Sequence, residues 1–146
     1  MSQTTPDHRD AELVLRLYEM RREAVTRESR KTISFDFLPR SYDDLLSIAQ
    51  PKHPHNAAWR QMSSYWEMVY GLGRHSIVHA EYLVENSGEG LLLYSKVKPY
   101  VERYRQDFSP FAFQNAQWAA ERTERGRALV AIFEKRIATQ LAAAKS

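Results

Sequence analysis

Apolar residues recur at every third or fourth position along most of the chain, the spacing that places them on one face of an α-helix. Residues 6–30 show the pattern first, at Leu13, Val14, Leu17 and Val25. Thr5 precedes Pro6, and a capping hydroxyl followed by proline is a common helix start. We therefore expect one long amphipathic helix over residues 6–30.

A second long helix is expected from Ser109-Pro110 to near the C-terminus. Small and apolar residues follow a repeat of three and four, at Ala116, Ala119, Thr123, Gly126, Val130, Phe133, Ile137 and Leu141. Such a seam is typical of a packed helix pair, and a glycine within it allows a close approach. The seam over 126–141 and the stripe over 13–25 can each pack internally or against a second copy of the chain.

Shorter helices are expected between these two. Ser41 opens a capping-box-like segment that runs to residue 49, and Asn56 is the expected cap of a third helix that ends or bends at Gly71 and Gly73. A fourth helix is expected over residues 75–85. A fifth, over residues 91–107, should kink at Pro99, because proline removes a backbone hydrogen bond and crowds the preceding turn.

Residues 32–38 break the helical pattern. Ile33, Phe35 and Phe37 alternate with Ser34 and Asp36, which is typical of a strand. One isolated strand is not stable, and no second segment offers itself as a partner. We expect an extended connector that presses its aromatic rings onto the core, with pairing to a second copy as the alternative.

These elements predict an all-α fold, a bundle of five to six helices with long N- and C-terminal helices. A chain of 146 residues fits one domain, so we expect a single helical domain over 1–146, frayed over 1–5 and 142–146. The longest apolar runs, 91–94 and 128–133, are far shorter than the roughly 20 residues that span a bilayer. A cytoplasmic protein with no membrane span is expected.

Composition removes several kinds of chemistry. The chain has no cysteine, which excludes thiol nucleophiles, disulfides and thiolate metal sites. The net charge is +3, but acids and bases are interleaved, so no phosphate-binding stripe stands out and no nucleic-acid partner is expected. Tyrosines and arginines alternate over 94–108, where core tyrosines with solvated arginines are favoured over a nucleic-acid clamp.

Three segments carry a resemblance to a known kind of protein. They are Tyr-Trp-Glu-Met-Val-Tyr-Gly-Leu-Gly-Arg-His (65–75), Lys-Pro-Tyr-Val-Glu-Arg-Tyr-Arg (98–105) and Phe-Gln-Asn-Ala-Gln-Trp-Ala-Ala (113–120). Together, over residues 65–122, they resemble an uncharacterised bacterial family of helical domains of unknown function. The chain departs from that family at Trp66, and we expect no N-terminal membrane helix of the kind that some members carry. The resemblance implies an all-helical unit and no activity.

Two histidines form the sharpest candidate for chemistry. His75 and His79 are four residues apart, so one helix could present both to a metal ion. Ser76 stands where the zinc motif His-Glu-x-x-His has its glutamate. No acidic residue lies three positions before any histidine, which excludes the usual di-iron motif. A capping or surface pair is favoured, and no cofactor is expected.

Large aromatic residues form the second candidate. Trp59, Tyr65, Trp66 and Tyr70 could line an apolar ligand pocket between helices, although aromatics at helical spacing are more often plain core. Nucleotide-binding loops and a nucleophile elbow are absent, so no catalytic signature is found. The leading hypothesis is an interaction or scaffolding module that forms a homodimer. The alternative is a small-ligand or metal-binding protein with its site near residues 65–79.

Overall fold

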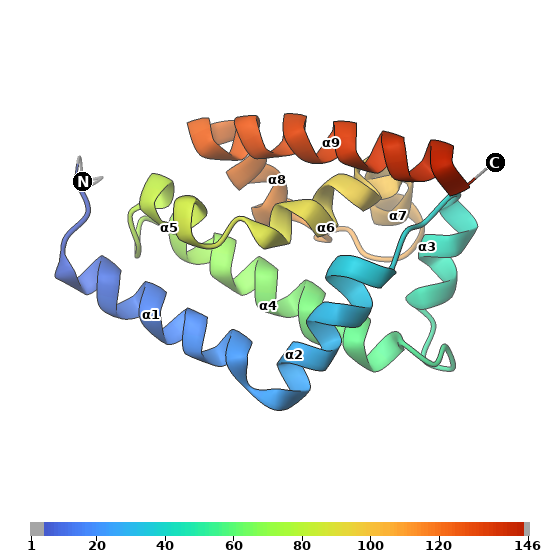
Figure 1. Ribbon diagram of the computed structural model, residues 1–146, viewed down its shortest axis with the longest axis horizontal. Coiled ribbons are helices and arrows are strands. Elements are labelled where there is room, and N and C mark those ends of the chain that lie inside the picture. The colour runs from blue at the N-terminus through green and yellow to red at the C-terminus, as the bar shows by residue number, and fades with distance from the viewer. Residues whose placement is uncertain (1–4, 145–146) are drawn as a thin grey trace.

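The computed structural model describes residues 5–144, and every regular element in that range is a helix (Figure 1). The all-α fold class is therefore confirmed. Residues 142–144, expected to fray, belong to the last helix, whereas 1–4 and 145–146 lie outside the described residues. Within the described range, no helix is both long and apolar enough to cross a bilayer.

The N-terminal segment forms two helices, α1 (His8–Arg22) and α2 (Ala24–Arg30), in place of the single one predicted. Glu23 divides them, because its backbone is extended (φ −61°, ψ 143°) and its carboxylate accepts the Thr26 N–H at 3.1 Å. A side chain that caps a following helix competes with continuation of the preceding one. As a result α2 turns away from α1 (Figure 1).

The expectation of an extended connector over residues 32–38 was wrong over most of its length. Lys31–Asp36 form a six-residue π-helix, η1, that continues directly from α2. The Phe37 N–H donates to the Thr32 carbonyl at 2.9 Å, a bond that spans five residues. Ile33 is buried, but Phe35 is 58% exposed, so only part of this apolar set reaches the core.

The central helices begin and end close to their sequence signals, with two exceptions. Asn56, expected as a cap, is instead the first residue of its helix, where no side chain caps the N-terminus. They are α3 (Tyr42–Ile48), α4 (Asn56–Arg74), α5 (Ala80–Asn86), α6 (Glu89–Val97), the 3₁₀ turn η2 (Lys98–Tyr100) and α7 (Val101–Asp107). The Ser41 hydroxyl accepts the Asp44 N–H at 3.2 Å, as the capping pattern predicts, and Pro99 lies in the break between α6 and α7. The helix predicted from residue 75 begins only at Ala80.

The C-terminal seam is also divided, into α8 (Gln114–Arg122) and α9 (Glu124–Ala144). Thr123 separates the two helices, because its backbone is extended and its hydroxyl accepts the Gly126 N–H at 2.9 Å. A Cβ at position 126 would collide with the Ala119 carbonyl, so Gly126 lets the start of α9 lie against α8, within the segment that was expected to form one helix.

Helix α4 lies at the centre of the helical fold. It packs against α2, α5 and α8, while α6 packs against α8 and α9, and α9 runs along one edge of the molecule (Figure 1). Gly90 lets α6 approach the Trp66 indole, since a Cβ there would lie 2.5 Å from Trp66 Cδ2. The α9 residues Val130 and Ile137 are buried, so most of the C-terminal seam packs within the chain.

Candidate interaction surface

One side of α4 is exposed and carries small and polar residues. Arg60, Ser64 and Met68, which we call the α4 ridge, are spaced four residues apart and are all exposed. Residues at this spacing follow one another along a helix surface. Ser63 beside the ridge is half-buried, and both serine hydroxyls donate to backbone carbonyls of α4, so their side chains lie flat against the helix.

An apolar groove of about 560 Å³ runs along one side of the ridge and is bounded by α7, the loop before α8 and the loop before α4; we call it the α7 groove. Aromatic rings make its walls, among them Trp59, Tyr104, Phe108 and Phe113. Phe108 is 51% exposed at the rim and stacks on Tyr104, with 5.2 Å between ring centroids. Large contiguous apolar patches on a folded chain are typical of interaction surfaces and ligand grooves.

Glu67 lies in the α7 groove and ties α4 to α8. Its two carboxylate oxygens accept the N–H groups of Asn115 (3.0 Å) and Ala116 (2.8 Å), in the first turn of α8. Phe113, the residue before α8, has a left-handed backbone (φ 59°) and offers no side-chain cap, so Glu67 takes that role from another helix. Burial raises the pKa of the Glu67 carboxyl, and its two backbone hydrogen bonds oppose the rise.

A second groove, of about 520 Å³, lies on the other side of the ridge, where α1 and α2 meet; we call it the α1–α2 groove. Met20, Tyr65 and Met68 give it an apolar lining, and Ser64 borders both grooves. Met20 and Met68 are each 44% exposed. The break at Glu23 creates this groove, because an uninterrupted first helix would not bend around α4.

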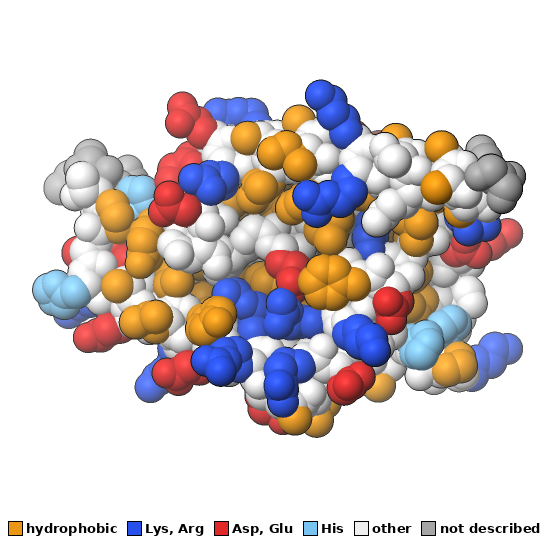
Figure 2. Space-filling view, viewed as in Figure 1, with side chains coloured by type: hydrophobic (Ala, Val, Ile, Leu, Met, Phe, Trp, Pro, Cys, Tyr) orange, Lys and Arg blue, Asp and Glu red, His pale blue; other side chains and the backbone are white. Residues whose placement is uncertain are grey.

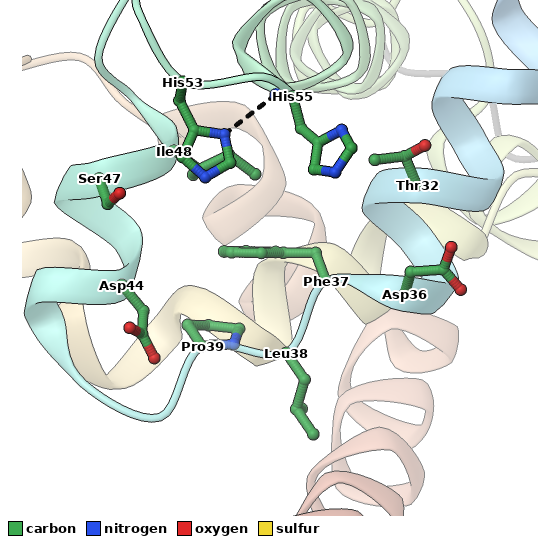
Figure 3. Close-up of a pocket in the computed structure, with 10 residues that line it drawn as sticks. All are labelled: Thr32, Asp36, Phe37, Leu38, Pro39, Asp44, Ser47, Ile48, His53 and His55. Atoms are coloured by element: carbon green, nitrogen blue, oxygen red, sulfur yellow. Dashed lines mark hydrogen bonds between the residues drawn. The ribbon is translucent and has the colours of Figure 1, made fainter.

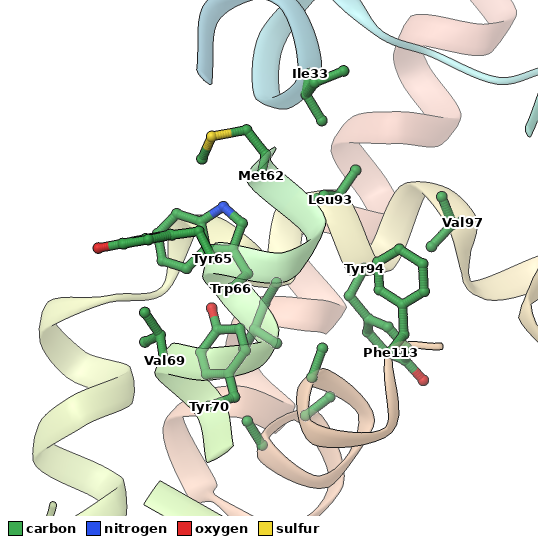
Figure 4. Close-up of a cluster of buried hydrophobic side chains, with 14 of the residues drawn as sticks. Ile33, Met62, Tyr65, Trp66, Val69, Tyr70, Leu93, Tyr94, Val97 and Phe113 are labelled. Carbon is green, nitrogen blue, oxygen red and sulfur yellow. The ribbon is translucent and has the colours of Figure 1, made fainter. Parts of the chain in front are cut away.

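The predicted aromatic site is part of the packed core, and Figure 4 shows three of its members, Tyr65, Trp66 and Tyr70. Trp59, Tyr65, Trp66 and Tyr70 are 4%, 8%, 2% and 0% exposed, and Trp66 contacts the rings of both tyrosines. The Tyr65 and Tyr70 hydroxyls each donate to a backbone carbonyl at 2.7 Å, of Leu17 and Ser87. Burial raises the pKa of both phenols. Trp59 borders the α7 groove and Tyr65 the α1–α2 groove, so the four do not converge on one pocket.

The predicted histidine pair does not lie on one helix. His75 is the C-cap residue of α4 and His79 the N-cap residue of α5, with a turn between them. The His79 ring accepts the Tyr82 N–H at 3.2 Å, which is the capping role favoured above. Across residues 5–144, no three His, Asp or Glu side chains are arranged to hold a metal ion.

The arginines of the 94–108 segment are engaged by neighbours. Tyr104 is 4% exposed, as expected of a core anchor. Arg103 lies over the Tyr42 ring, with 4.1 Å between its Cζ and the ring centroid. Arg105 is half-buried, and its Nε donates to the Ala112 carbonyl at 2.8 Å. The expectation that Arg105 points to solvent was therefore wrong. On the face shown in Figure 2, basic side chains gather below the centre with carboxylates among them.

A further cavity was missed by sequence reasoning. About 360 Å³ in volume, it is lined by His53, His55, Asp36, Asp44 and six other residues (Figure 3). The only signal in the sequence is the dense turn Pro-Lys-His-Pro-His at 51–55, which by itself reads as a loop. The two carboxylates of the cavity, Asp36 and Asp44, come from the end of η1 and from α3, and no spacing rule connects those segments.

Comparison with known proteins places the chain in context. A family model described as a domain of unknown function (DUF4760) matches residues 6–123. The match confirms the resemblance to an uncharacterised family and extends it from residues 65–122 towards the N-terminus. No curated protein and no solved structure matches the chain.

Proposed function

Because the chain belongs to the DUF4760 family, whose description assigns no activity, we propose its function from its surface: it is an interaction module that forms a homodimer across the α4 ridge. The observation that carries this proposal is the pair of open apolar grooves on the two sides of Ser64. The expected cytoplasmic location stays a prediction.

The charges along α4 fit a second copy in antiparallel orientation. Arg60 and Glu67 are seven residues apart, about 10.5 Å along the helix axis. A twofold axis between Ser63 and Ser64 places Arg60 of each protomer opposite Glu67 of the other, which gives two such contacts. The same axis places the α7 groove of one protomer against the α7 groove of its partner, and likewise the two α1–α2 grooves. Arg60 Nε donates to Asn56 Oδ1 at 2.9 Å, which leaves its terminal nitrogens for the partner.

The residues at the proposed crossing point are small. Side chains as short as Ser63 and Ser64 allow two helices to pack at the close end of the usual 8–10 Å between axes. Met20, Met68 and Phe108, which line the two grooves, then become buried against the partner copy. Methionine and phenylalanine are typical of the buried centre of protein interfaces, and lysine is depleted there.

The absence of cysteine from the sequence permits a direct test. Ser64→Cys creates a single thiol beside the twofold axis, and we expect mild oxidation or a short bis-maleimide to cross-link it. Gln140→Cys, on the exposed side of α9, is the matched control and should not cross-link. Equal cross-linking of the two variants would contradict the proposal.

Mass measurement gives the second test. Sedimentation equilibrium should give twice the 17.1 kDa of the chain. Ser64→Arg brings two like charges together at the axis and should yield a monomer, whereas Gln140→Arg should stay dimeric. A wild-type protein that is monomeric at high concentration, or a dimer that survives Ser64→Arg, would refute the proposed interface.

A ligand site near residues 65–79, the alternative from the sequence, gains no support from the buried positions of Tyr65, Trp66 and Tyr70. We therefore propose the homodimer alone as the function of the α4 ridge.

A further inference from the structure

We propose that the cavity around Phe37 binds a compact organic cation, an amine or quaternary ammonium group on a small apolar body. This cavity, which we call the Phe37 cavity, lies between the end of η1, the 37–39 loop, α3 and the turn that precedes α4. Its volume of about 360 Å³ falls in the range of small-molecule sites.

The π-helix aims Phe37 into the cavity. The Phe37 N–H donates to the Thr32 carbonyl, and the buried Lys96 ammonium donates to the Ser34 carbonyl at 2.7 Å, which ties η1 to α6. In Figure 3 the Phe37 ring lies with the histidines on one side and Asp44 on the other, while the Leu38 side chain points away from that ring. The ring also packs edge-on against Trp59, 5.7 Å between centroids, which fixes it from behind. π-Helical turns are frequent at functional sites.

The lining charge selects for a cation. Asp36 and Asp44 contribute two carboxylates, and no lysine or arginine is among the ten lining residues, although the chain as a whole carries +3. Asp44 accepts the Arg40 N–H with one oxygen, and its other oxygen remains to face a ligand. Within residues 5–144 the Asp36 carboxylate makes no ion pair. Lys96 is close enough for the Asp36 charge to affect its pKa, but its ammonium group donates to the Ser34 carbonyl.

The remaining lining groups suit a cation with an apolar body. Phe37 offers a ring face, and the quadrupole of an aromatic ring attracts a cation placed over it. Thr32 and Ser47 add hydroxyls, and Pro39 and Ile48 add apolar surface. An anion would meet two carboxylates and no fixed positive charge.

Titration with choline chloride tests the proposal, with 3,3-dimethylbutan-1-ol as the neutral carbon analogue of the same shape. The reporter is the indole N–H resonance of Trp59, which lies behind Phe37, in ¹H–¹⁵N NMR spectra. We expect saturable shifts with choline in the millimolar range and binding of the alcohol at least roughly tenfold weaker, a free-energy difference that one ionic contact supplies. No saturable shift, or equal binding of the alcohol, would overturn the inference.

Two neighbouring aspartates provide a matched pair of variants. Asp44→Asn keeps an oxygen for the Arg40 N–H but removes the charge, and it should weaken choline binding about tenfold, as should Asp36→Asn. Asp43→Asn removes an equal charge from the same turn of α3, outside the cavity lining, and should leave affinity within about twofold. An equal effect of all three would show general attraction only and would overturn the site. The result is independent of the homodimer, because these residues lie outside the α4 ridge.

Discussion

Lys96→Met replaces a buried ammonium group by an apolar side chain of similar length. Lys96 lies in α6 and is 4% exposed, and its Nζ donates to the Ser34 carbonyl at 2.7 Å. Burial lowers the pKa of Lys96 from 10.5 to about 8, while the nearby Asp36 carboxylate opposes this change. At neutral pH Lys96 therefore still carries its charge in the folded protein, and burial of that charge lowers the free energy of unfolding.

The sign of the pH dependence follows from proton binding. Between pH 8 and 10.5 the unfolded chain holds a proton on Lys96 that the folded chain has released. The free energy of unfolding consequently rises with pH in that window, by at most about 1.4 kcal/mol per pH unit. Below the folded pKa the full penalty remains, about 3 kcal/mol for the difference between the two pKa values.

Methionine removes this penalty but leaves the Ser34 carbonyl without its donor, at a cost of about 1–2 kcal/mol. We expect Lys96→Met to be more stable than wild type by about 1–2 kcal/mol near pH 7, and the difference to vanish or reverse by about pH 9.5. Above that range, ionisation of tyrosines adds a second pH dependence. Burial raises the pKa of Tyr70 and Tyr94 in the folded protein, so the free energy of unfolding falls as the phenols of the unfolded chain ionise.

Urea denaturation followed by tryptophan fluorescence, from about pH 7 to 9.5, measures the effect. The control is Lys98→Met, two residues further on, where an exposed ammonium pairs with Glu134 at 3.0 Å. That variant should change stability by less than about 1 kcal/mol and keep the wild-type pH slope. Parallel slopes for wild type and Lys96→Met would refute the reasoning.

Two further substitutions test the packing. Gly126→Ala sets a methyl group against the Ala119 carbonyl. Despite alanine's higher helix propensity, this clash should lower the free energy of unfolding by about 2 kcal/mol or more in thermal or urea melts. An unchanged midpoint would contradict the close approach of α8 and α9. Tyr70→Phe leaves the Ser87 carbonyl without its 2.7 Å partner and should cost about 1–2 kcal/mol, and an unchanged stability would mean that this carbonyl finds another donor.

Local signals in the sequence were reliable where one residue acts on its own backbone. Ser41 caps α3 and Pro99 interrupts the fifth helical segment, both as predicted. The same rules failed at Glu23 and Thr123. Each of these residues fits inside a helical pattern, and only the geometry of the following helix makes its side chain a cap.

The 32–38 segment shows why a short periodic pattern can mislead. Alternation of Ile33, Phe35 and Phe37 is typical of a strand, but three positions do not distinguish a strand from a π-helix when tertiary contacts supply the missing bonds. Here the Lys96 ammonium, distant in sequence, holds the Ser34 carbonyl. A basic residue in an apolar run gave no sign of that role.

The repeat of apolar positions at three and four residues determined by itself that this chain is helical and that Trp59, Tyr65, Trp66 and Tyr70 lie on buried faces, because each helix hides one face from water. The tertiary structure decided which faces stay open and which side chains share a cavity. The α4 ridge depends on the bend at Glu23, and the Phe37 cavity joins Asp36 to His53 across different elements. Such contacts arise from the packing of whole helices, which periodicity within one helix does not encode.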